Sequence, residues 1–199
     1  ECIDYWLTDA IVHPDDSTEA STEIKFQLPR CWTCYSPPHD EVDIVERTEA
    51  DYAPTFGVVN HVSKFSAASY KTWAEILHQC SNARLLIKSP ALADPLIKER
   101  LKANLQNYNA PLDRIDILGS TPKHTDHFLT YNDIDICLDT FPYSGGTSTA
   151  DALWMGTPVI TLMGSRLAER MSASMLYATG MDNWVTETTA DYIALAVQC

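Results

Sequence analysis

The chain has 199 residues, 45% of them hydrophobic, which is the composition of a globular protein that can bury a sizeable core. Acidic residues outnumber basic ones by 27 to 14, and the net charge of −13 argues against nonspecific binding to nucleic acid or to an anionic membrane. No apolar run reaches the ~18–20 residues of a membrane helix and no signal-peptide pattern opens the chain, so the sequence predicts a soluble, cytoplasmic protein.

Residues 1–50 lack the regular pattern of the rest of the chain. Asp4–Asp9 and Ile24–Leu28 have the composition of short strands, and the stretch between them is polar and acidic. The proline-containing residues 36–43 are typical of an extended, solvated connector. We therefore predict that residues 1–50 are the end of a preceding lobe followed by an interdomain linker.

From Thr55 onward, short apolar segments alternate with helical patterns. Strands are expected at residues 56–60, 83–87, 114–118, 134–138 and 158–162, and helices at 67–80, 95–108, 125–131, 147–155 and 167–179. This alternation predicts an α/β fold, a Rossmann-like parallel sheet with helices on both faces, spanning residues 51–199. A last helix starts at Asp191 and stops with the chain, so we expect a C-terminally truncated lobe of a larger protein.

A glycine loop stands between the strand expected at 134–138 and the helix expected at 147–155. Gly145 and Gly146 allow a ligand to approach the backbone closely, and Thr147 and Ser148 are suited to begin a helix. Free amides and the positive end of a helix dipole would then face one point, which favours a bound phosphate. The motif is neither an ATPase loop nor a dinucleotide fingerprint, and an ordinary turn and cap without a ligand remains an alternative.

The run LDTFPYSGGTSTADALWMGTPVITL, residues 138–162, resembles the donor-binding segment of the protein O-GlcNAc transferase and SPINDLY family. The similarity continues through residues 164–174 and reaches back through residues 56–65. The resemblance implies the two-lobed GT-B glycosyltransferase fold, with residues 51–199 as the C-terminal, nucleotide-sugar-binding lobe.

The resemblance also implies roles for four residues in loops that follow strands. Lys64 would bind the donor diphosphate and offset the charge that develops on it in the transition state, although a lone lysine is usually a solvated surface residue. His127 would contact the base, whereas Pro122 and His124 fall where the family places a base-reading backbone segment and a base-stacking side chain. Without the family resemblance, a single histidine such as His127 would more often be a structural or surface residue.

The same resemblance assigns the glycine loop to the donor. Gly145, Gly146, Thr147 and Ser148 would surround the β-phosphate, and Asp151, one helical turn further on, would accept a hydrogen bond from the ribose. Gly146 stands where the animal O-GlcNAc transferases carry a histidine, so one side-chain donor is lost. This difference, together with the Phe-Pro-Tyr run of the SPINDLY-type sequences, leaves the identity of the donor sugar open.

The function implied is transfer of GlcNAc from UDP-GlcNAc to Ser or Thr of proteins. The alternatives are a GDP-fucose-dependent protein O-fucosyltransferase and a non-catalytic nucleotide-sugar-binding module. The protein acceptor would be held by an N-terminal lobe and tetratricopeptide (TPR) repeats that lie outside this chain, so we expect this chain alone to be inactive.

No metal or other cofactor is expected, because Lys64 and the loop amides would replace the cation that other transferases place on the diphosphate. Cys31 and Cys34 have the spacing of a metal or redox pair. No second pair follows them, and we interpret them as structural or incidental thiols.

Overall fold

The computed structural model describes residues 2–38, 42–45 and 53–198, and these residues form two parallel sheets. In the smaller sheet, β1 (Tyr5–Thr8) pairs with β2 (Ile24–Gln27). The larger sheet has the strand order β5-β4-β3-β6-β7-β8. Its strands are β3 (Thr55–Val59), β4 (Arg84–Lys88), β5 (Ile115–Leu118), β6 (Ile136–Leu138), β7 (Val159–Leu162) and β8 (Val185–Thr186).

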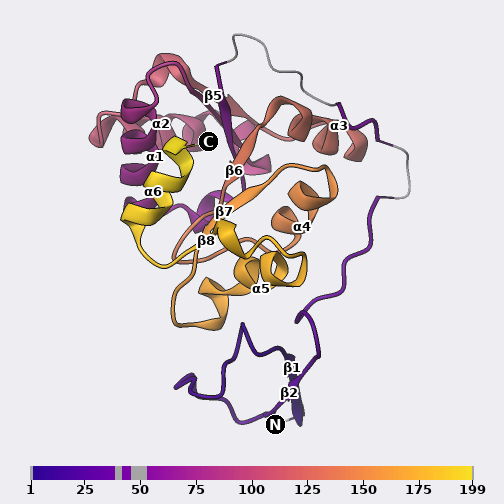
Figure 1. The fold of residues 1–199 in the computed structure, drawn as a ribbon. Coiled ribbons are helices and arrows are strands. Elements are labelled where there is room, and N and C mark those ends of the chain that lie inside the picture. The colour runs from indigo at the N-terminus through magenta and orange to yellow at the C-terminus, as the bar shows by residue number, and fades with distance from the viewer. Residues whose placement is uncertain (1, 39–41, 46–52, 199) are drawn as a thin grey trace.

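Three helices cover each face of the larger sheet (Figure 1). One face carries α1 (Ala67–Gln79), α2 (Pro95–Asn107) and α6 (Thr189–Gln198), and the other carries α3 (His124–Leu129), α4 (Thr147–Trp154) and α5 (Met171–Ala178). Side chains alternate along each strand, so Val58 packs with Trp73 of α1 while Val59 packs with Phe128 of α3. The predicted parallel sheet with helices on both faces is confirmed.

The chain changes direction across the sheet between β5 and β6. Strands β3, β4 and β5 are added toward one edge, after which β6 pairs with β3 on its other side and β7 and β8 continue toward the opposite edge. The connections therefore diverge at the carboxyl ends of β3 and β6. Open parallel sheets bind their ligands at such a point.

The helix predicted at 167–179 is wrong in its first part. Leu167–Glu169 form a 3-10 turn, and α5 begins only at Met171. The Glu169 carboxylate accepts hydrogen bonds from the amides of Ser165 and Arg166, at 2.8 and 3.1 Å, and so closes a separate turn. This local side-chain bonding competes with a continuous helix.

Two further differences lie near the end of the chain. The sequence analysis missed β8, whose two residues are too few to show a period. The last helix begins at Thr189, before the predicted Asp191, because the Asp191 amide donates to the Thr188 hydroxyl at 3.1 Å. That hydroxyl caps the helix in the usual manner of a threonine.

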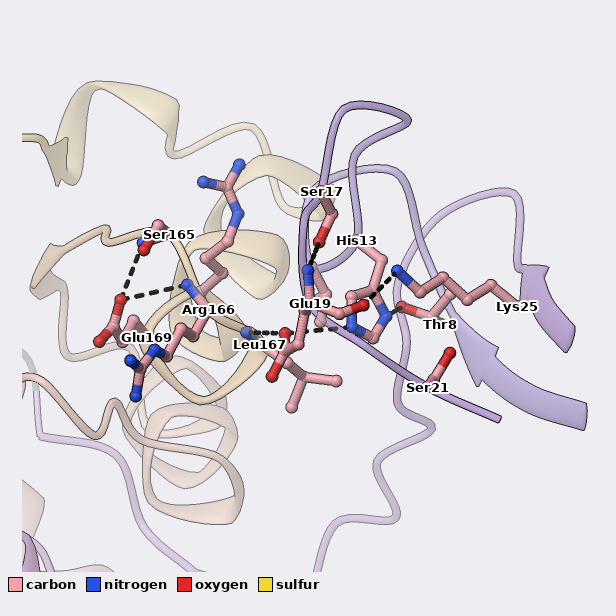
Figure 2. Close-up of polar contacts among 12 residues, drawn as sticks. Thr8, His13, Ser17, Glu19, Ser21, Lys25, Ser165, Arg166, Leu167 and Glu169 are labelled. Carbon is pink, nitrogen blue, oxygen red and sulfur yellow. Dashed lines mark hydrogen bonds and ion pairs between the residues drawn. The ribbon is translucent and has the colours of Figure 1, made fainter. Parts of the chain in front are cut away.

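The N-terminal segment contacts the turn that follows β7 (Figure 2). The Glu19 carboxylate accepts from the Leu167 amide at 2.8 Å and lies 3.3 Å from His13 Nε2. The other ring nitrogen of His13 is 2.9 Å from the Thr8 hydroxyl. His13 is buried, so the imidazole connects β1 to Glu19 and, through Glu19, to the larger sheet.

We expect acidification to loosen this N-terminal segment. Burial lowers the pKa of His13 below its ordinary value of 6.5, and Lys25 lowers it further, although Glu19 opposes both. The neutral ring therefore contributes stability above about pH 6.5, and this stability is lost as the pH falls through the lower folded pKa. Amide hydrogen exchange of β1 and β2 measured between about pH 7.5 and 5.5, after correction for intrinsic rates, should show protection falling with pH.

A variant that lacks the titrating imidazole is the control for that experiment. His13→Gln should flatten the pH dependence, whereas the same change at the exposed His78 should leave it as in the parent protein. Protection of β1 and β2 that rises on acidification would contradict the expectation.

Candidate functional site

A cavity of about 700 Å³ opens at the carboxyl ends of β3 and β4, beside the loops that follow β5 and β6. It therefore lies at the point where the strand connections diverge. The lining residues are Trp32, Val59, Asn60, His61, Lys64, Lys88, Pro90, Ser120, Thr121, Pro122, Lys123, His124, His127, Tyr143, Gly146, Thr147, Ser148 and Met171.

The charge of the cavity is opposite to that of the whole chain. The lining contains three lysines and three histidines and no aspartate or glutamate, although the chain carries a net charge of −13. Cationic groups collected in a concave site attract anions and raise their local concentration. The cavity is therefore suited to an anionic ligand, held by local donors and not by the field of the whole protein.

The start of α4 supplies backbone donors to this cavity. The amides of Thr149 and Ala150 donate to the Gly146 carbonyl at 3.0 and 3.1 Å, whereas those of Thr147 and Ser148 have no acceptor within the described residues. A Cβ placed on Gly146 would meet nothing within 4 Å, because that side of the backbone faces open space. The first amides of a helix, left free beside an open approach, form an anion site.

Gly145 lies in the same loop but is used differently. Its amide donates to the Asp139 carboxylate at 2.7 Å, and that carboxylate also accepts from the Thr161 hydroxyl at 2.7 Å. Asp139 is buried at the end of β6, and burial raises its pKa, although hydrogen bonds and the charge of Lys64 oppose the rise. Asp139, to which the sequence analysis gave no role, thus fixes the loop. The predicted contact of Gly145 with the nucleotide-sugar donor stays a prediction.

Lys64 lies at the cavity on the turn after β3. Its ammonium donates to the Ser144 carbonyl at 2.7 Å and lies 4.3 Å from the centre of the Tyr143 ring. Burial lowers the pKa of Lys64, and the negative charge of Asp139 opposes this effect. The ammonium has three N–H donors, and within the described part of the chain only one of them has a hydrogen-bond acceptor, so two remain for a ligand. The structure brings Lys64 and the start of α4 to one cavity, as the sequence analysis expected.

The other end of the cavity is formed by α3 and the loop before it. His124 and His127 project from α3 with their ring centres 6.4 Å apart and their planes inclined by 26°. Both rings line the cavity, and so does Pro122. Aromatic faces of this kind can stack on a planar ring. The three predicted base-side residues thus gather at one end, while their contacts to a base stay a prediction.

Asp151 lies behind the cavity and is not part of its lining. Its carboxylate accepts a hydrogen bond from the Tyr35 hydroxyl at 2.7 Å, and its second oxygen is 3.6 Å from His127 Nε2. The carboxylate thus lies beside the His127 ring, at a distance longer than a hydrogen bond. The predicted ribose contact of Asp151 is not tested by these contacts and stays a prediction.

Several lining residues received no role in the sequence analysis, and Trp32 and Lys88 are the most informative of them. Trp32 comes from the N-terminal segment, and its indole N–H donates to the Met171 carbonyl at 3.3 Å. Nothing local in the sequence marks it, because it joins the site only through tertiary contacts. Lys88 ends the apolar run of β4 and is buried at the cavity. Its place as a charged residue at the end of a buried strand was a signal that could have identified it.

In the described ranges, no group of three or more histidine, cysteine, aspartate or glutamate side chains is placed to hold a metal ion. No helix formed by these residues has the length and apolarity needed to cross a membrane.

Comparison with known proteins gives one family and several relatives. Residues 46–199 match the model of glycosyl transferase family 41. A probable UDP-N-acetylglucosamine–peptide N-acetylglucosaminyltransferase SPINDLY from Eustoma exaltatum subsp. russellianum is 35% identical over 98% of this chain and 22% of its own length. The SPINDLY protein of Arabidopsis thaliana, which has the same description, is 31% identical over 98% of this chain and 21% of its own length. This chain thus spans about a fifth of these curated relatives.

A solved structure of an O-GlcNAc transferase has the same fold as this chain. A mutant of the O-GlcNAc transferase of Thermobaculum terrenum superposes with a TM-score of 0.88 and 37% sequence identity. The match covers 98% of this chain and 37% of that one. Both the N-terminal segment and the larger sheet therefore have counterparts in that protein.

Proposed function

The chain belongs to glycosyl transferase family 41, and on this basis we propose that it binds the nucleotide-sugar donor of a protein O-GlcNAc transferase. The donor would be UDP-GlcNAc and the acceptor a Ser or Thr hydroxyl of a protein. The observation that carries this proposal is the cavity, whose lining has three lysines, three histidines and no carboxylate in a strongly acidic chain. The donor is an anion that requires such a lining.

The two ends of the cavity suit the two parts of a nucleoside diphosphate. Lys64 and the free amides of Thr147 and Ser148 would hold the phosphates, and the histidine rings of α3 would lie against the base. When the glycosidic bond breaks, negative charge develops on the departing diphosphate. Donors that are already in place stabilise that charge in the transition state more than in the ground state, which accelerates the reaction.

We also propose that the transfer needs no metal ion. The ammonium of Lys64 and the dipole of α4 would supply the positive charge at the diphosphate. Activity that survives treatment of the longer protein with a chelator would agree with this proposal, and activity that is lost and then restored by a divalent ion would contradict it.

The acceptor side of the reaction would lie in the rest of a longer protein, with a preceding lobe and TPR repeats. The small sheet supports this proposal, because Tyr5, Leu7, Ile24 and Phe26 are between 53% and 62% exposed and present an apolar face that a preceding lobe would cover.

We place the protein in the cytoplasm. All five cysteines within the described ranges are free thiols, which suits a reducing compartment.

We expect the purified 199-residue chain to bind UDP without transferring sugar to a peptide. Binding needs only the cavity, whereas transfer also needs groups that hold the acceptor hydroxyl. Calorimetric titration with UDP, GDP, UDP-GlcNAc and GDP-fucose checks the first part, and a peptide glycosylation assay checks the second. Preference for the GDP compounds would exclude the UDP-GlcNAc assignment, turnover by this chain would show that its own residues hold the acceptor, and no binding of any of the four ligands would refute the proposed function.

A further inference from the structure

We propose that Lys88 determines which base the cavity accepts, by donating a hydrogen bond to a carbonyl oxygen on the edge of the base. The inference rests on the proposed function and adds a side-chain basis for its specificity. A base with an oxo group at this edge, such as uracil or guanine, would be accepted. A base with an amino group there, such as cytosine or adenine, would be rejected.

The position of Lys88 in the sheet places it on the base side of the cavity. Lys64 and the start of α4 follow β3 and β6, which are neighbours, and they form the phosphate end. Lys88 ends β4, one strand further from β6, and the next strand, β5, leads into the loop with Pro122. Adjacent strands lie about 4.8 Å apart, so Lys88 is about two strand spacings from β6. It therefore lies between the diphosphate donors and the base-side loop.

The ammonium of Lys88 has donors to spare. The side chain is 3% exposed, and its Nζ donates to the Thr130 hydroxyl at 2.6 Å. That hydroxyl gives its own hydrogen to the Asp126 carbonyl at 3.0 Å, so it can only accept from Lys88. No other acceptor for Lys88 Nζ lies within hydrogen-bonding distance among the residues that the structure describes. Two of its three N–H groups therefore remain for a ligand.

Burial gives these spare donors a free-energy cost unless an acceptor bonds to them. A buried cation is stable only when it is paired and hydrogen-bonded, and Thr130 is a neutral partner. Burial lowers the pKa of the Lys88 ammonium, and the negative charge of Asp126 opposes this shift. A ligand oxygen that accepts from Lys88 would offset this cost. A site that is built to form a hydrogen bond with one group of a ligand binds an analogue without that group much more weakly.

The chemistry of an ammonium determines which base edge it can bond. It donates hydrogens and cannot accept one. Uracil and guanine present a carbonyl oxygen where cytosine and adenine present an amino group. An amino group facing Lys88 would set donor against donor and leave the cation without its acceptor. The expected preference is therefore UDP over CDP and, for purines, GDP over ADP.

The test compares these pairs of nucleotides by calorimetric titration of the full chain. We expect the parent protein to bind UDP at least ~10-fold more tightly than CDP, since a hydrogen bond to a charged group contributes roughly 1.5–3 kcal/mol. Lys88→Met keeps the length of the side chain and removes its donors, so it should reduce the ratio of UDP to CDP affinity toward one. Lys88→Gln offers both a hydrogen-bond donor and an acceptor, so this variant should bind UDP and CDP about equally. It provides the test if Lys88→Met does not fold.

Two further variants separate base recognition from other roles. Lys102→Met removes an exposed lysine of α2 and should leave the ratio unchanged. Thr130→Val removes the hydroxyl to which Lys88 is bonded, and the ratio should persist, because Lys88 itself remains in the lining of the cavity. If Lys88 acted only by holding η4 (Thr130–Asp133) in place, Thr130→Val would reproduce the effect of Lys88→Met.

The outcomes distinguish this inference from the proposed function. A parent protein that binds UDP and CDP alike, or a Lys88→Met variant that weakens both nucleotides equally, would overturn base recognition by Lys88 and leave the donor cavity intact. A parent protein that binds none of the four nucleotides would overturn both. A ratio that collapses in the Lys88 variants alone would establish the inference.

Discussion

Gly146→Val should reduce the affinity for UDP by about 100-fold or more, because the side chain would deny the phosphate two charge-assisted hydrogen bonds of roughly 1.5–3 kcal/mol each. A Cβ at Gly146 meets no protein atom within 4 Å, so the added side chain enters the cavity beside the amides of Thr147 and Ser148. The added Cβ has no protein atom to clash with, so we expect the fold to be retained. Calorimetric titration with UDP and a thermal melt of the same variant check both parts.

Substitutions at the two neighbouring positions are the controls. Thr147→Ser keeps the amide and the hydroxyl and should bind UDP like the parent protein. Gly145→Ala should lower the melting temperature, because its Cβ would lie 2.1 Å from the Thr149 hydroxyl, which is bonded to Ser172. If Gly146→Val binds UDP as well as the parent does, the amides at the start of α4 do not hold the phosphate.

Most of the larger sheet could be predicted from the sequence because its strands and helices carry strong local periods. The strands from β3 to β7 and the helices that connect them were found with boundaries one or two residues off at most ends. The short strands β1 and β2 were indicated as well, but not their pairing, which joins segments 19 residues apart, Tyr5 to Ile24. Strand β8 was missed because it exists only as a partner of β7.

The candidate site shows the same division between local and tertiary information. The glycine loop, Lys64 and His127 stand in motifs that can be recognised along the chain, and the structure gathers them at one cavity. The roles of Asp139 and Lys88 depend on their burial, and only Lys88, at the end of the apolar run of β4, had a signal in the sequence. Trp32 reaches the cavity from a segment that the sequence analysis assigned to a preceding lobe. Residues that act through their environment are thus the ones that sequence reasoning missed.

Lys64→Ala should weaken the binding of UDP by about 1.5–3 kcal/mol, the contribution of a hydrogen bond to a charged group, or roughly 10- to 150-fold in affinity. The ammonium lies at the phosphate end of the cavity, and among the described residues the Ser144 carbonyl is its only hydrogen-bond acceptor. Uridine lacks phosphates and should bind the variant and the parent protein equally. Titration of both proteins with UDP and with uridine gives the phosphate-specific part as the difference between the two losses.

The comparison with uridine separates a ligand contact from a structural one. Lys64 also donates to the Ser144 carbonyl, so its removal could displace the glycine loop and weaken every ligand. The exposed Lys71 of α1 is the matched control, since Lys71→Ala changes the net charge equally and lies outside the cavity lining. Equal losses for UDP and uridine would show that Lys64 acts by holding the loop. A similar loss of UDP affinity in Lys71→Ala would show that net charge, and not a contact at the phosphate, controls the binding.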